Sequence, residues 1–127
     1  MESSYSIHPA ENLVHMRVRG ELTVDGLIDL ISRAGRDPDF VQGMNAIADL
    51  RESFGNWDYS EIQRYRDYIV RIANNQKRRW AAVVKPGTLV GVAHVVMVIS
   101  QPVSHGIEMQ LFDSPQVALQ WVRGDLD

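Results

Sequence analysis

Short strand-like runs alternate with helical segments along this chain, and that alternation restricts the fold more than any other feature. The strand-like runs are residues 5–8, 13–19, 44–50, 80–84 and 107–112. In the second and last runs, apolar and polar residues alternate with a period of two, which is typical of strands with one buried face. Because single helices join most runs, we expect right-handed crossovers and a mainly parallel mixed α/β sheet, with the N-terminal hairpin strand antiparallel.

Capping residues indicate where three of the helices begin. Thr23 precedes an apolar stripe with helical spacing and is expected to cap the first helix. Asp58, with Glu61 three residues later, forms a candidate capping box for the second. Ser114 and Pro115 supply the cap and first position of the last. With a further helix expected at 89–100, the element order is β-β-α-β-α-β-α-β-α.

Length and composition predict one domain over residues 1–127. The formal net charge is -3, so no overall positive field exists to gather nucleic acid. The chain has no cysteine, which excludes disulfides and thiolate metal sites. The polar N-terminal stretch does not resemble a signal peptide, and the longest apolar run is too short to span a bilayer. We therefore expect a cytoplasmic protein without a transmembrane segment.

Three short stretches carry a resemblance to a known family. They are residues 20–23, residues 49–57 with the sequence Asp-Leu-Arg followed by Phe54 and Trp57, and residues 109–122. They resemble the SpoIIAA-like fold of STAS domains, the sulfate-transporter and anti-sigma-antagonist modules, and of many small uncharacterised bacterial proteins. The resemblance implies a regulatory serine at the start of the helix after the strand at 44–50. Ser60 is the nearest candidate for such a phosphoacceptor.

The carboxyl ends of the parallel strands are the expected place for a ligand. The segment after the strand at 44–50 supplies Asp49, Arg51, Phe54 and Trp57, which would combine aromatic walls with a few charges. Lys85 follows the next strand. The alternative, which we favour, is that the two aromatic side chains only close the core over the end of the sheet.

Residues 89–100 form an apolar run in which only glycine, histidine and serine interrupt aliphatic side chains. The length, the cap and a following proline favour a helix, although the valine-rich composition also fits a strand. A helix that is apolar all round has to be covered. Besides burial in the core, the candidates are a homodimer contact, a cavity for an acyl chain, or a membrane surface. The candidate binding residues on it are Val90, His94, Met97 and Val98.

Sequence motifs for catalysis or metal binding are absent. The four histidines do not have ligand spacing, and the chain contains no nucleophile elbow, P-loop or dinucleotide-binding fingerprint. The basic run Lys77, Arg78 and Arg79 follows a helix C-terminus, where interaction with the helix dipole and solubility explain it at least as well as phosphate binding.

We therefore expect a non-enzymatic binding or regulatory module, without a cofactor, that acts through protein-protein association, including self-association as a homodimer. The alternative is a carrier of a small apolar or amphipathic, lipid-like ligand held between the segment 89–100 and the sheet, or a protein associated with a membrane surface. A third and weaker hypothesis is an enzyme that uses Asp49, Arg51, Lys85 or His94.

Overall fold

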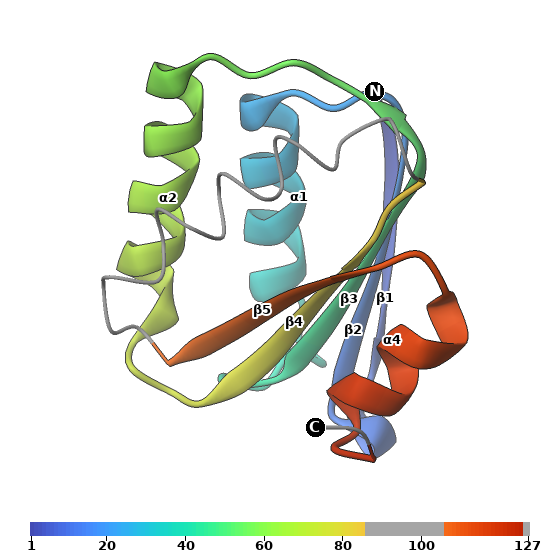
Figure 1. Ribbon diagram of the computed structural model, residues 1–127. Coiled ribbons are helices and arrows are strands. Elements are labelled where there is room, and N and C mark those ends of the chain that lie inside the picture. The colour runs from blue at the N-terminus through green and yellow to red at the C-terminus, as the bar shows by residue number, and fades with distance from the viewer. Residues whose placement is uncertain (86–105, 126–127) are drawn as a thin grey trace.

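Within the described residues, five strands form one mixed sheet whose spatial order follows the order of the chain (Figure 1). The computed structural model describes residues 1–85 and 106–125. The strands are β1 (Glu2–His8), β2 (Leu13–Glu21), β3 (Asn45–Phe54), β4 (Arg78–Val83) and β5 (Ile107–Phe112). β1 pairs antiparallel with β2, and the other three pairs are parallel. The predicted mixed sheet and its antiparallel N-terminal strand are confirmed, and β5 lies at the edge of the sheet that the described strands form.

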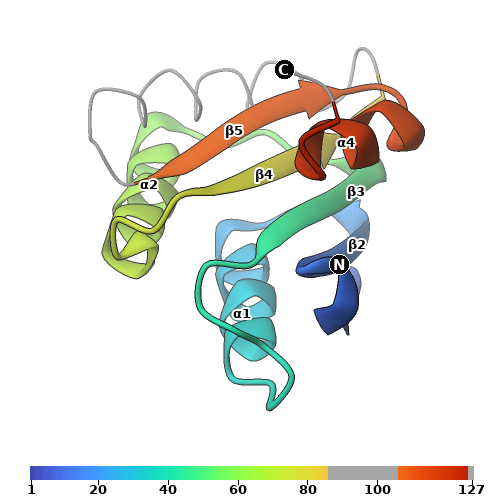
Figure 2. The same cartoon turned by 90° about the horizontal axis from the view of Figure 1, so that it is seen from below.

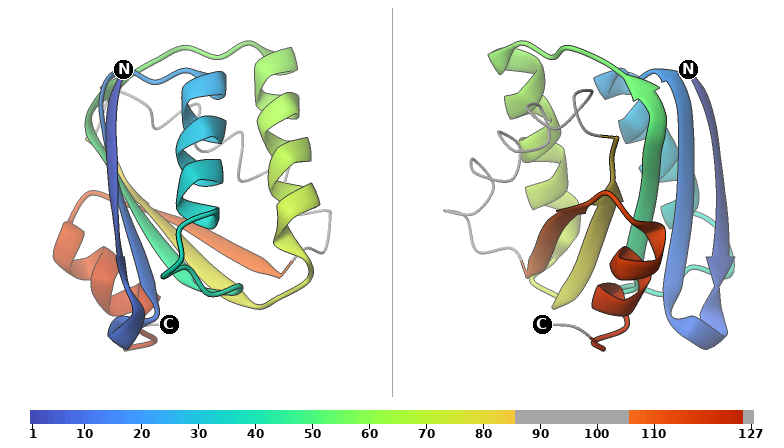
Figure 3. Two further views of the ribbon diagram at one scale, coloured as in Figure 1. Left: turned by 180° about the vertical axis from the view of Figure 1, so that it is seen from behind. Right: turned by 45° about the vertical axis from the view of Figure 1, so that its right-hand side comes forward.

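Helices cover both faces of this sheet unequally. α1 (Val24–Gly35) and α2 (Tyr59–Ala73) lie side by side on one face, and the shorter α4 (Pro115–Val122) lies on the other (Figures 2 and 3). A short 3₁₀ turn, η1 (Pro9–Glu11), joins β1 to β2. Among the described residues, no helix is long and apolar enough to cross a membrane. The helix expected at 89–100 lies outside the described residues.

The predicted caps are present at the start of all three described helices. The Thr23 hydroxyl accepts a hydrogen bond from the Gly26 amide at 3.0 Å. The Asp58 carboxylate accepts from the Glu61 amide at 2.8 Å, while the Glu61 carboxylate accepts from the Asp58 amide at 3.1 Å. Ser114 caps α4 in the same way. Each cap satisfies amide groups that the first turn of a helix leaves unpaired.

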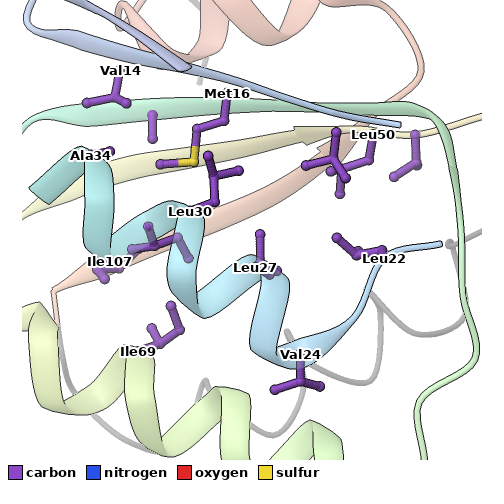
Figure 4. Close-up of a cluster of buried hydrophobic side chains, with 14 of the residues drawn as sticks. Val14, Met16, Leu22, Val24, Leu27, Leu30, Ala34, Leu50, Ile69 and Ile107 are labelled. Atoms are coloured by element: carbon purple, nitrogen blue, oxygen red, sulfur yellow. The ribbon is translucent and has the colours of Figure 1, made fainter. Parts of the chain in front are cut away.

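Successive side chains of a strand point to opposite faces of the sheet, so the described apolar residues form two separate cores, one on each face. The larger core lies between the sheet and the helices α1 and α2, where Leu30 and Ile69 are fully buried beside Met16 of β2 (Figure 4). The smaller core lies under α4. Its buried members are Leu13, Ile47, Ala81, Val83, Ala118, Trp121 and Val122. In β4, the side chains of Trp80 and Ala82 face α1 and α2, whereas those of Ala81 and Val83 face α4.

β3 is longer than the predicted strand, which ended at Leu50. A bulge lets Arg17 pair with Asp49 while Arg19 pairs with Glu52, and pairing with β2 then continues to Phe54. The polar side chains of this extension find partners across the strands. Arg19 forms an ion pair with Glu52 at 2.5 Å. The polar composition after Leu50 is typical of a loop, but these cross-strand partners keep residues 51–54 in the sheet.

Candidate functional site

Asp49 and Arg51 lie in β3 and not in a loop, so the expected loop between 49 and 57 is mostly strand. The Arg51 guanidinium donates two hydrogen bonds to the Asp49 carboxylate, at 2.8 and 3.0 Å. These hydrogen bonds lower the pKa of Asp49 below its ordinary value of 3.8 and raise the pKa of Arg51. The pair is satisfied within itself, and it faces the side of the sheet that carries α4.

The two aromatic residues of this region have different surroundings. The Trp57 side chain is buried, and its indole N–H donates to the Leu22 carbonyl at 2.9 Å. Its ring makes an edge contact with Tyr65, with ring centroids 5.5 Å apart. Phe54 is 56% exposed. Trp57 therefore closes the larger core over the end of the sheet, and the two aromatic residues do not share one environment.

The remaining predicted site residues are scattered. Ser60 is exposed in the first turn of α2, and Lys85 is exposed after β4. The four residues expected on the segment 89–100 lie outside the described residues. They are Val90, His94, Met97 and Val98. Within residues 1–85 and 106–125, no three histidine or acidic side chains gather in a group that could hold a metal ion.

A cavity of about 260 Å³ lies between the sheet and the C-terminal halves of α1 and α2. Its walls come from the beginnings of β2, β3 and β4, from both helices, and from the segment that joins α1 to β3. The apolar wall includes Val14 and Met16 of β2 and Ala34 in the last turn of α1 (Figure 4). The cavity thus lies at the amino ends of the parallel strands, away from the carboxyl ends where the sequence led us to expect a ligand.

Among the described residues that line this cavity, Arg78 is the one with a charge, and it is buried, with 7% of its surface exposed. Its Nη2 donates to the carbonyls of Ile72 and Ala73, at 3.3 and 2.9 Å, at the C-terminal end of α2. The guanidinium also lies 5.7 Å from the centroid of the Trp80 ring. Burial lowers the pKa of Arg78. The predicted interaction of the basic run with a helix C-terminus is confirmed for this residue.

Neutral polar groups complete the lining. Ser32 and Tyr68 contribute hydroxyls from the two helices, and Gln42 contributes an amide from the segment after α1. Burial raises the pKa of the Tyr68 hydroxyl, which favours its protonated form. Gly35 and Gln42 are exposed members of the lining and mark the side on which the cavity approaches solvent. Apolar walls with a few polar groups are typical of small-molecule sites.

Sequence reasoning did not single out this cavity or the role of Arg78 in it. The run Lys77-Arg78-Arg79 reads as a solvated basic patch, yet its members have different environments. Lys77 is exposed, Arg78 points toward α1 and α2, and Arg79 contacts the Trp121 ring on the opposite face, 4.9 Å from its centroid. One feature of the sequence could have indicated this. Side chains two residues apart in a strand lie on the same face, so Arg78 was expected to share a face with the apolar Trp80.

Comparison with known proteins supports the fold. No protein-family model and no curated protein sequence matches the chain. Among solved structures, the chain is similar to the crystal structure of an uncharacterised protein of the DUF3478 family from Shewanella loihica PV-4, described as having a SpoIIAA-like fold. The two share 15% identity with a TM-score of 0.58, over 94% of this chain and 93% of that one. The chain therefore has a SpoIIAA-like fold, as the resemblance of its motifs implied.

Proposed function

We propose that the chain is a non-enzymatic binding module that takes a small, largely apolar molecule into the cavity between the sheet and the helices α1 and α2. The observation that carries the proposal is the cavity itself, which has apolar walls from several elements and a few polar groups. Liquid water occupies about 30 Å³ per molecule, so about 260 Å³ corresponds to roughly nine non-hydrogen atoms. The occupant is therefore smaller than a typical drug-sized ligand.

The proposal agrees with the predicted carrier in its ligand class but differs in its location. The carrier hypothesis put the ligand between the segment 89–100 and the sheet. The described walls of this cavity come from β2, β3 and β4 of the sheet, from α1 and α2, and from the segment that joins α1 to β3. The paired charges of Asp49 and Arg51 satisfy one another and lie on the opposite face of the sheet. Asp49 and Arg51 are therefore not needed for the proposed binding.

Filling the cavity tests this function. Ala46 of β3 lines the cavity, and Ala48 faces the same side of the sheet without lining it. Ala46→Leu is expected to abolish binding of hexanol and benzyl alcohol, because the added side chain occupies their space, whereas Ala48→Leu is expected to retain it. Binding is measured by titration of backbone amide signals in NMR spectra. Thermal unfolding of both variants shows whether overpacking, which typically costs about 1–3 kcal/mol, has affected the fold.

Absence of any saturable shift in the wild-type protein would contradict the proposal. Equal loss of binding in Ala46→Leu and Ala48→Leu, with both variants folded, would also contradict it, because the probes would then not occupy the cavity. Shifts confined to residues around the cavity would support it.

A second candidate function is self-association through the free edge of β1. Within the described residues, β1 pairs with β2 alone, so its outer edge is open to a further strand. Antiparallel pairing with a second copy about Tyr5 would place Glu2 opposite His8, an acceptor facing a donor. It would also place Ser4 opposite Ser6. This self-complementary register favours a symmetric dimer.

Lysines at the paired serines test this dimer. Ser4→Lys combined with Ser6→Lys would place like charges opposite one another across the symmetry axis, so we expect a monomer where the wild type is a dimer. His15→Lys, on the neighbouring strand β2, puts the same charge beside Ser6 but away from the free edge, and it should leave the dimer intact. Sedimentation velocity measures the mass. A monomeric wild type, or an unchanged mass in the double variant, would exclude pairing through β1.

A further inference from the structure

Two hydroxyl groups meet where α1 and α2 border the cavity. Ser32 of α1 and Tyr68 of α2 both line it, and both side chains are half-buried. Burial raises the pKa of Tyr68, and a hydrogen bond that the Ser32 hydroxyl donates to the Tyr68 oxygen offsets part of this rise. The polar part of the wall therefore includes a pair of hydroxyls, one from each helix, that interact with each other.

Arg36 sets the direction of the hydrogen bond between these hydroxyls. Its Nη1 donates to the Ser32 Oγ at 3.0 Å. A guanidinium has only donors, so Ser32 accepts from Arg36 and has its own proton left to donate to the Tyr68 oxygen. Tyr68 keeps its own proton as a donor, for which none of the described side chains acts as the acceptor. The series Arg36, Ser32 and Tyr68 thus ends in an O–H donor at the wall of the cavity.

The charges around Tyr68 favour the same kind of ligand atom. The Arg71 guanidinium lies 5.5 Å from the centroid of the Tyr68 ring, and the positive charges of Arg71 and Arg36 both favour negative charge at the Tyr68 hydroxyl. Neither arginine lines the cavity, and Arg78, which does, already donates to carbonyls of α2. A full negative charge in the cavity would therefore be poorly compensated, whereas an oxygen with partial negative charge suits this donor.

The rest of the wall limits the body of the ligand. Phe40 and Trp80 contribute aromatic rings, and Met16 and Ile31 contribute aliphatic groups. The volume allows roughly nine non-hydrogen atoms, so a short apolar body with one polar atom fits. A carbonyl oxygen meets the requirement at Tyr68, because it accepts a hydrogen bond and brings no proton of its own to meet the O–H donor.

We propose that the cavity is a site for a small uncharged carbonyl compound, whose oxygen accepts a hydrogen bond from the Tyr68 hydroxyl and whose apolar body lies against Met16, Ile31 and Trp80. This inference rests on the proposed function and adds the chemical class of the ligand. Tyr68 is then the residue that selects for an oxygen acceptor, and the apolar side chains select only for size.

Acetophenone and α-methylstyrene test the requirement for an acceptor, because they have the same shape and number of non-hydrogen atoms and only acetophenone has a carbonyl. Titrations followed by NMR are expected to show that Tyr68→Phe weakens acetophenone binding about three- to tenfold, as the loss of one neutral hydrogen bond allows. The same variant should leave α-methylstyrene binding unchanged. Tyr59→Phe is the matched control on α2, because Tyr59 is 65% exposed and its hydroxyl accepts from Gln63. It should bind both probes as the wild type does.

A second measurement on the wild-type protein keeps the test decisive if Tyr68→Phe does not fold. The infrared C=O band of bound acetophenone is expected at a lower frequency than in hexane, because a hydrogen bond weakens the C=O bond, and NMR cross-peaks should join the acetophenone methyl group to the Tyr68 ring. An unshifted band, absent cross-peaks, or a Tyr68→Phe variant that binds acetophenone as the wild type does would overturn the assignment of a carbonyl to Tyr68. The proposed function would then still stand if α-methylstyrene and hexanol bind. If acetophenone, α-methylstyrene and hexanol all fail to bind, the proposed function fails as well.

Discussion

Trp121→Ala is expected to lower the free energy of unfolding by about 3–5 kcal/mol, the usual cost of removing a large aromatic side chain from a core. Trp121 is 2% exposed and is the largest side chain of the smaller core. Its ring contacts Phe112, with centroids 5.5 Å apart, and the Arg79 guanidinium lies over it. The described part of α4 is short, so few other contacts can compensate for the loss.

Urea denaturation followed by fluorescence and circular dichroism measures this change. Val117→Ala is the matched control, because Val117 lies on the same helix but is 40% exposed, and we expect it to cost less than about 1 kcal/mol. A cost for Trp121→Ala as small as that of the control would mean that α4 does not hold its face of the sheet closed.

Gly106→Ala is expected to cost about 2–4 kcal/mol, from two causes that act together. Gly106 has a φ of +86°, a conformation that residues with a side chain rarely adopt. A Cβ atom there would lie 2.7 Å from the Gln76 carbonyl oxygen, so backbone would have to move. The Gly106 carbonyl accepts a hydrogen bond from the Arg78 amide at 3.1 Å, and the disturbance therefore reaches the wall of the cavity.

Gly124→Ala separates the two causes. Gly124 has the same φ of +86°, but a Cβ atom there would meet nothing within 4 Å. This variant should show only the conformational cost, about 1–2 kcal/mol. Unfolding by urea gives both values under the same conditions. If both substitutions lowered the free energy of unfolding equally, the backbone at Gln76 would be able to move away from the added Cβ at no cost. The close approach of Gln76 to Gly106 would then not be a constraint.

Local signals in the sequence were enough to predict most of the fold. Thr23, Asp58 with Glu61, and Ser114 with Pro115 start helices through hydrogen bonds that span only a few residues, so the pattern can be read without tertiary structure. The alternation of strands and helices determined the parallel sheet in the same way. The end of β3 was missed because Glu52 and Ser53 are kept in the sheet by partners on β2. Ser53, for example, donates to the Val18 carbonyl at 2.8 Å.

The candidate site was not predictable by the same means. Its cavity depends on how closely side chains from two helices, three strands and a connecting segment pack, which is a property of shape that the pattern does not contain. The burial of Arg78 depends on where α2 ends relative to the first residue of β4. Periodicity predicts that Arg78 and Trp80 share a face, but it does not show that a guanidinium on that face donates to the last carbonyls of α2.

The agreement between strand order and chain order has a consequence for the way the molecule is made. β1 and β2 form a hairpin around a short turn, and each later parallel strand joins the edge left by the one before it. None of the five described strands has to insert between two strands that have already paired. A nascent chain leaving the ribosome can therefore assemble the sheet by successive addition, with each new crossover closing a loop of modest length.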